Sequence, residues 1–191
     1  MNELRSPPVQ TADDVLIRES IREPERFAPL FDRHADAVHR YLARRIGESA
    51  ADLLAETFLV AFRRRAAYQP TQLDVRPWLF GIATNVLRRH VRQEGRRYRA
   101  LARVGWSEPG AYADDPPDDR LDAQALRAEL AAALAALKPA DRDVLLLVAW
   151  AQLSYAEIAA TLEIPIGTVR SRLNRARRLT RAALNMPEED R

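Results

Sequence analysis

The segment SYAEIAATLEIPIGTVRSRLNRARR, residues 154–178, concentrates side chains that can bind nucleic acid. Its second half carries five arginines and no acidic residue, although like charges at helical spacing destabilise an isolated helix. Arginine can donate a fork of hydrogen bonds to guanine, asparagine can pair with adenine, and flanking arginines can neutralise phosphates. We therefore expect a bound polyanion to balance this charge.

Two short helices are predicted to position these side chains. Ser154 and Glu157 have the spacing of a capping box, so the first helix should start there. The run Pro165-Ile166-Gly167 predicts a turn, and Thr168 is expected to cap the second helix. This layout is typical of a helix-turn-helix whose second helix enters a major groove.

The second helix has two chemically different sides. At 100° per residue, Val169 and Leu173 fall on the side predicted to be buried. The predicted duplex-binding residues are Thr168, Arg170, Ser171, Arg172, Asn174, Arg175 and Arg178. The alternative is a solvated basic helix without a ligand, but the cap, the turn and the sorted faces together favour DNA.

A second basic face is predicted on the segment RPWLFGIATNVLRRHVRQEGRRYRA, residues 76–100. One side of the predicted helix is apolar and includes Val91. The other side holds Trp78, Asn85, Arg88, Arg89 and Arg92. An aromatic ring beside a cationic track is how single strands are held. A tryptophan at a helix start is also an ordinary core anchor, and the residues alone do not separate the two interpretations.

A third face lies in AADLLAETFLVAFRRR, residues 50–65. Its narrow side places Leu59 among charged residues of both signs, including Asp52 and Glu56. A small apolar centre with a polar rim suits a protein contact. A scattered exposed leucine is the equally ordinary alternative.

Composition limits the classes of protein that the chain can be. Its 191 residues carry a net charge of +3, and it has no cysteine for disulfides or thiolate metal sites. No apolar run approaches the length of about 18 residues that a membrane span needs. The chain is expected to be soluble and cytoplasmic, with no membrane insertion, no metal and no cofactor.

Helical periodicity predicts an all-α fold of two small helical domains joined by a flexible acidic linker. The linker is the proline-rich, acidic stretch 105–120. A tail with a first short helix is predicted at 1–23, the first domain at 24–104, the second at 121–186, and a C-terminal tail at 187–191. The predicted helices lie near residues 12–20, 24–45, 50–68, 77–102, 121–137, 139–150, 155–162 and 169–184.

Taken together, DLLAETFLVAFRR, the tryptophan-containing block and LSYAEIAATLEIPIGTVRSRL resemble the extracytoplasmic-function (ECF) group of sigma-70 RNA polymerase sigma factors. The blocks occur in the order and spacing of that family. Two departures are the Ala55 in place of a frequent glutamine, and WAQLSY in place of a run with glycine. The alanine lacks a polar contact that is common in the family. The absence of the glycine leaves the conformation of the turn before Ser154 open.

The resemblance implies a function and partners. Region 2 of such proteins binds the clamp helices of the largest subunit of core RNA polymerase and captures the melted non-template strand of the −10 element, whereas region 4 reads the −35 element as duplex promoter DNA. It also implies that an anti-sigma factor holds the protein inactive. The polymerase-binding residues would be Asp52, Leu53, Glu56, Phe58 and Leu59. A flipped base would lie between the loop 67–76 and Trp78, Asn85 and Arg89.

Two other functions are alternatives to this one. A stand-alone helix-turn-helix transcription regulator would need only the duplex-binding helix. A nucleic-acid enzyme is disfavoured, because the chain has three histidines and no paired-carboxylate or phosphate-loop spacing. His34 and His39 miss the i, i+4 spacing of a helical metal pair. No catalytic residue is predicted.

Overall fold

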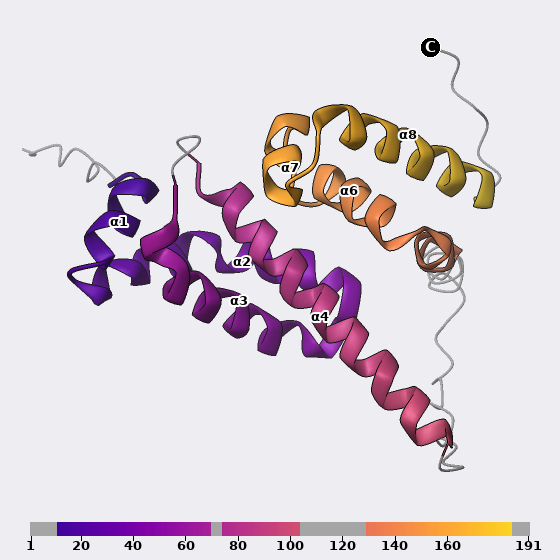
Figure 1. Cartoon of the computed structure of the whole chain (residues 1–191), viewed down its shortest axis with the longest axis horizontal. Coiled ribbons are helices and arrows are strands. Elements are labelled where there is room, and N and C mark those ends of the chain that lie inside the picture. The colour runs from indigo at the N-terminus through magenta and orange to yellow at the C-terminus, as the bar shows by residue number, and fades with distance from the viewer. Residues whose placement is uncertain (1–10, 70–73, 104–128, 185–191) are drawn as a thin grey trace, which may run out of the picture. The chain divides into compact units, whose positions relative to one another are not determined.

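A computed structural model describes residues 11–69, 74–103 and 129–184 (Figure 1). The regular elements of these ranges are all helices, as predicted. The chain divides into two compact units, residues 1–86 and 87–191, and each is described by itself. The division falls inside one long helix, and the predicted domain range 24–104 stays a prediction.

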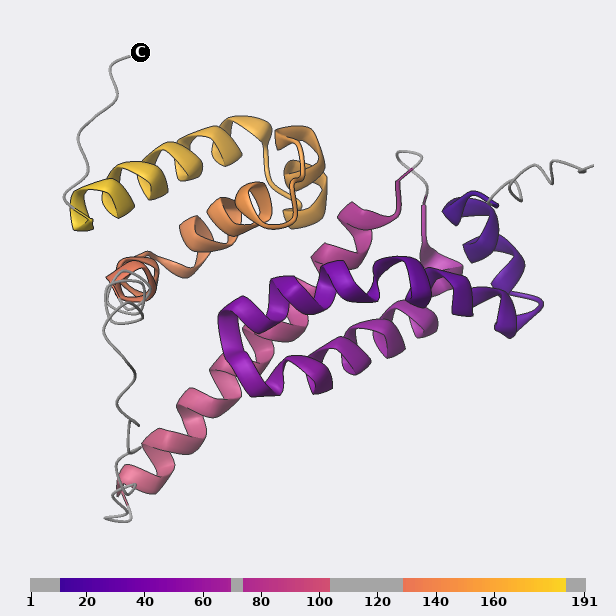
Figure 2. The same ribbon diagram turned by 180° about the vertical axis from the view of Figure 1, so that it is seen from behind.

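The first unit is a bundle of helices. It contains α1 (Asp13–Ser20), α2 (Ala28–Ile46), α3 (Ala50–Arg64) and the start of α4 (Arg76–Arg103), with 3-10 turns at Pro24–Phe27, Gly47–Ser49 and Arg65–Ala67. Helices α2 and α3 pack side by side (Figure 2). Gly47 ends α2 with a φ of 57° and a ψ of −120°, a conformation that essentially only glycine tolerates.

Large buried side chains join α2 to the start of α4. Tyr41 packs edge-on against Phe80, with ring centroids 5.3 Å apart. The hydroxyl of Tyr41 also lies 2.9 Å from the hydroxyl oxygen of Thr84, and both residues are buried. The burial of Tyr41 therefore leaves its polar atom satisfied, which avoids the cost of an unpaired hydroxyl. This packing orients α4, which carries the predicted single-strand face.

The apolar stripe of α4 is buried over only part of the helix. Leu79, Ala83, Val86 and Leu87 are buried as predicted. The prediction for Val91 is wrong, because its side chain is 48% exposed. Gln93 and Arg92 beside it are also exposed, so this turn of α4 continues beyond the packed part of the helix.

The second unit holds a helical segment at 129–136 and helices α6 (Pro139–Ala149), α7 (Tyr155–Leu162) and α8 (Ile166–Ala183). Helix α8 packs against both α6 and α7. The core between them is built from Val144, Leu146, Leu147, Leu153, Ile158, Val169, Leu173 and Ala176. The prediction for α7 matches the observed bounds, and α6 ends one residue earlier than predicted.

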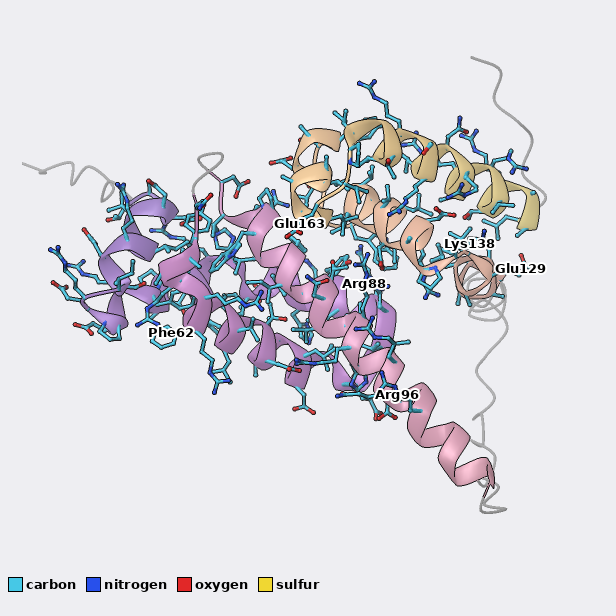
Figure 3. All side chains as sticks on the ribbon, in the orientation of Figure 1. Phe62, Arg88, Arg96, Glu129, Lys138 and Glu163 are labelled. Atoms are coloured by element: carbon cyan, nitrogen blue, oxygen red, sulfur yellow. The ribbon has the colours of Figure 1, made fainter. Side chains whose placement is uncertain are left out.

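The turn between α7 and α8 differs from the prediction. Glu163 takes the left-handed conformation after α7, with a φ of 53°, and Figure 3 labels its side chain there. Pro165 is the N-cap of α8, and the backbone N–H of Thr168 already donates to its carbonyl at 2.8 Å. Ile166 and Gly167 are therefore helical rather than part of the turn, and Thr168 lies in the first helical turn rather than at the cap. The fixed φ of proline, here −58°, starts the helix early.

Some predictions lie outside the described residues. These are the acidic linker at 105–120, the residues 1–10 and 187–191 of the two tails, and the predicted start of the helix at 121–128. Within the described ranges, no helix combines the length and apolar character that crossing a bilayer requires.

Candidate nucleic-acid interface

Helix α8 presents one buried side and one cationic side. Val169 and Leu173 are at most 2% exposed and fix the rotation of the helix against the rest of the unit. The sequence of α8 contains six arginines and no acidic residue. The exposed predicted residues are Arg170, Ser171, Asn174, Arg175 and Arg178, whereas Thr168 and Arg172 are half-buried. The sequence-predicted face therefore exists as one surface of a single helix.

A complete capping box positions the helix that precedes α8. The backbone N–H of Glu157 donates to the Ser154 hydroxyl at 3.3 Å, and the backbone N–H of Ser154 donates to the Glu157 carboxylate at 2.6 Å. This confirms the prediction from the spacing of the two residues. The cap satisfies two N–H groups that would otherwise lack intrahelical partners. It therefore supports α7, whose buried Ile158 contributes to the core of the second unit.

Arg175 differs from the other predicted base-reading residues, because its guanidinium is already engaged. Its Nε donates to Oδ2 of Asp141 at 2.7 Å, and its Nη2 donates to Oδ1 at 2.5 Å. This hydrogen bonding is the main cause that lowers the pKa of Asp141. Asp141 lies in the first turn of α6 and its side chain is 1% exposed. The pair thus joins α8 to α6 by one buried carboxylate.

The predicted single-strand face lies along α4. Trp78 is half-buried, and its ring lies 5.0 Å from the ring of Tyr68, tilted by 56°. Asn85, Arg89 and Arg92 are exposed, and Arg88 is half-exposed. Figure 3 shows the side chains of Arg88 and Arg96 on this helix. Helical spacing places these residues on one side of α4, with Trp78 toward the start of the helix.

The predicted protein-contact residues of α3 fall into two groups. Leu59 is 47% exposed, Asp52 is exposed and Glu56 is half-exposed. Leu53 and Phe58 are only 4% and 6% exposed, so they lie in the core of the first unit. Phe58 also packs edge-on against Phe31, with centroids 4.8 Å apart. Of the five residues predicted to bind polymerase, Leu59, Asp52 and Glu56 therefore remain accessible to a partner.

Sequence reasoning did not identify the partners of the predicted binding residues, among them Tyr68 and Asp141. Tyr68 supplies the ring against which Trp78 packs, and burial raises the pKa of its phenol. Asp141 supplies the carboxylate that holds Arg175. An acidic residue in the first turn of a helix is ordinary, because it interacts favourably with the helix dipole. The residue type of Asp141 therefore gives no local signal that it pairs with Arg175, and nothing in the local sequence signals the contact between Tyr68 and Trp78.

Comparisons with known proteins place both units in one family. The family model "Sigma-70 region 2" matches residues 30–97, and the model "Sigma-70, region 4" matches residues 127–179. The chain is 40% identical over 156 residues to the ECF RNA polymerase sigma factor SigE of Mycolicibacterium smegmatis, covering 80% of this chain but only 59% of that protein.

Three further proteins match this chain over most of their own length. The identity is 35% to the RNA polymerase sigma factor CarQ of Myxococcus xanthus, covering 79% of this chain and 84% of CarQ. The solved structure of CnrH in complex with the cytosolic domain of CnrY superposes with a TM-score of 0.64 at 25% identity, covering 92% of this chain and 98% of that chain. A sigma factor RpoE in complex with the anti-sigma factor NepR from Bartonella quintana also has a TM-score of 0.64, at 22% identity, covering 85% and 98%.

The fold is that of an all-helical protein with a helix-turn-helix in its second unit. The chain belongs to the sigma-70 family of RNA polymerase sigma factors and, within that family, to the ECF group.

Proposed function

We propose that this chain binds core RNA polymerase and directs it to promoters, by reading the −35 element as duplex and by capturing the melted non-template strand of the −10 element. The observation that carries the proposal is the presence, in one chain, of a cationic helix-turn-helix and of a region 2 with an aromatic and cationic helix. A regulator that acts without polymerase needs only the first of these.

The exposed side of α8 is the duplex reader in this proposal. Its arginines and Asn174 have the hydrogen-bonding groups that recognise guanine and adenine edges in a major groove. The remaining cations are suited to phosphates, whose neutralisation supplies affinity without sequence information. The buried stripe of Val169 and Leu173 keeps this side turned away from the core.

The Trp78 side of α4 is the strand-capturing surface. Stacking of a base on an aromatic side chain contributes about 1–3 kcal/mol, which helps to offset the cost of unstacking that base in the duplex. Asn85 and Arg89 are exposed on the same side and can contact the base and the backbone. Tyr68 supports the ring of Trp78 from the preceding segment.

The exposed part of α3 is the polymerase-docking surface. Leu59 is its apolar centre, and Asp52 and Glu56 form an acidic rim. We expect this surface to meet the clamp helices of the largest polymerase subunit. An anti-sigma factor is the second partner proposed, because a solved sigma factor of the same fold is held by one.

Transcription reconstituted from purified components tests the proposal. The full chain is added to core RNA polymerase on a library of promoter fragments, and transcript starts are sequenced. Discrete start sites that depend on the chain are expected. A chain that fails to bind core polymerase, or that binds it without producing discrete starts, would contradict the proposal and favour a stand-alone regulator.

Two variants separate the proposed surfaces. Trp78→Ala should slow opening of the promoter at least about five-fold through loss of one stacking contact, while duplex binding is unchanged, and Trp78→Phe should restore opening. Leu59→Asp should weaken binding to core polymerase. Ile21→Asp is its matched control, because Ile21 is 48% exposed but lies outside the proposed surface.

A further inference from the structure

Arg175 of α8 is held by a buried carboxylate, in contrast to Arg170 and Arg178 on the same exposed side. Arg175 makes two hydrogen bonds to Asp141. In the part of the chain that the structure describes, no such side-chain contact is seen for Arg170 or Arg178. The Asp141 end of the pair is buried, with 1% of its side chain exposed, whereas 45% of the Arg175 side chain remains exposed. The pair therefore has one end in the core and one end facing solvent.

The geometry of the pair leaves a second hydrogen-bonding edge unused. A guanidinium has five N–H donors in one plane. Asp141 takes the Nε–H and one N–H of Nη2. The other N–H of Nη2 and both of Nη1 remain, and the two terminal nitrogens form an edge that can still grip the O6 and N7 atoms of a guanine or two phosphate oxygens.

Holding the side chain in advance changes what it contributes to binding. A long flexible side chain loses rotamer freedom when it docks, and a group that is already ordered loses less. The negative charge of the Asp141 carboxylate also offsets the positive charge of Arg175 on the cationic side of α8. This weakens the attraction of α8 to phosphates of any DNA sequence. Both effects raise the ratio of specific to non-specific binding.

We propose that Asp141 is a positioning residue for sequence recognition: it orients the guanidinium of Arg175 so that its Nη1–Nη2 edge reads the duplex. The inference rests on the proposed reading of duplex DNA by α8. Asp141 itself is not expected to touch DNA, since its carboxylate is buried. Lys138 and Arg172 are the other cations whose charge acts on this carboxylate, and neither makes the bidentate contact that Arg175 makes.

The test measures sequence discrimination with the full chain. A duplex is first selected from a randomised pool by the wild-type protein, and its dissociation constant is compared with that of a scrambled duplex of equal composition. Asp141→Asn keeps the shape of the side chain but leaves only one acceptor for the fork. We expect the preference for the selected duplex over the scrambled one to fall about 5- to 150-fold, the range of one bidentate base contact. Binding to the scrambled duplex should be unchanged or tighter.

A double-mutant cycle separates positioning from a general loss of structure. If Asp141 acts through Arg175, Asp141→Asn should have no further effect on discrimination in an Arg175→Ala background. Arg175→Lys keeps the positive charge but lacks the Nη1–Nη2 edge of the guanidinium, so it should lose discrimination as Asp141→Asn does. It therefore tests the inference even if the Asp141→Asn protein does not fold. Asp14→Asn, which removes the same charge from a surface pair in α1, is the matched control and should behave as wild type.

The outcomes distinguish the inference from the function on which it rests. A wild-type chain that selects no sequence would overturn duplex reading and the inference with it. A wild-type chain that selects a sequence, together with folded Asp141→Asn or Arg175→Lys variants that discriminate as well as wild type, would overturn the inference alone. An equal loss of affinity for both duplexes would assign Asp141 a structural role and would also overturn it.

Discussion

Removing the capping box of α7 should loosen that helix by an amount that can be calculated from its two hydrogen bonds. Replacement of an N-cap serine by alanine costs about 0.5–2 kcal/mol. Ser154→Ala removes only the longer bond, of 3.3 Å, because the backbone N–H of residue 154 can still donate to Glu157. We therefore expect the lower half of the range, about 0.5–1 kcal/mol. The double variant Ser154→Ala/Glu157→Ala removes both bonds and should cost about 1–2 kcal/mol.

Hydrogen exchange followed by mass spectrometry measures this loss where it occurs. Because about 1.4 kcal/mol corresponds to a factor of ten, amides of α7 should exchange about 2- to 5-fold faster in Ser154→Ala and about 5- to 30-fold faster in the double variant. Peptides from α2, in the other unit, provide an internal control. Ser154→Thr keeps the capping oxygen and should retain protection. Equal exchange in Ser154→Ala, the double variant and wild type would show that the cap contributes nothing to α7.

The remaining predictions concern backbone conformation and pH. Gly47→Ala should destabilise the first unit by about 1–3 kcal/mol in chemical unfolding, because the backbone of an L-residue with a Cβ is strained at a φ of 57° and a ψ of −120°. Gly167→Ala is the contrast: it is helical and has open space around it, so a gain of about 0.4–1 kcal/mol is expected, and a loss would show that its conformation is misassigned. Gln152→Gly should stabilise the second unit by about 0.5–1 kcal/mol, since glutamine there has a φ of 55°; a lower melting temperature would refute this. Acid should weaken the second unit through Asp141, whose pKa is lowered mainly by the hydrogen bond from Arg175. The stabilisation of the second unit by the ionised Asp141 is complete above the unfolded-state pKa of about 4 and is lost as the pH falls through the lower folded-state pKa. Unfolding curves of Asp141→Asn should not show this loss at low pH.

Local spacing predicted much of the fold because the interactions concerned are local. The capping box depends on two residues three apart, and the buried stripe of Val169 and Leu173 depends on helical periodicity alone. The same rules overestimated the buried length of α4, since periodicity places Val91 on the stripe but does not say where the packing partners end. They also placed the start of α8 too late. Glycine commonly interrupts helices, but Gly167 is helical because the helix already begins after Pro165.

The interface was predicted less completely, because its decisive contacts are long-range. Arg175 and Asp141 are 34 residues apart in the chain, and no pattern within either helix reveals their pairing. Family resemblance assigns Leu53, Phe58 and Leu59 alike to polymerase binding. Only the packing of α3 shows that Leu53 and Phe58 are buried whereas Leu59 is exposed. Residue types predict nucleic acid as the ligand, whereas the three-dimensional contacts show which of the predicted side chains are exposed and which are buried.

Helix α7 is bracketed by two non-glycine residues with positive φ, Gln152 before it and Glu163 after it. With only 8 residues it is far shorter than helices that persist alone in water. Its backbone therefore becomes ordered only together with the neighbours that bury Ile158. During synthesis on the ribosome, residues 139–184 should consequently acquire their DNA-facing form in a single cooperative step, after the last turn of α8 has emerged, and no shorter nascent chain should present it.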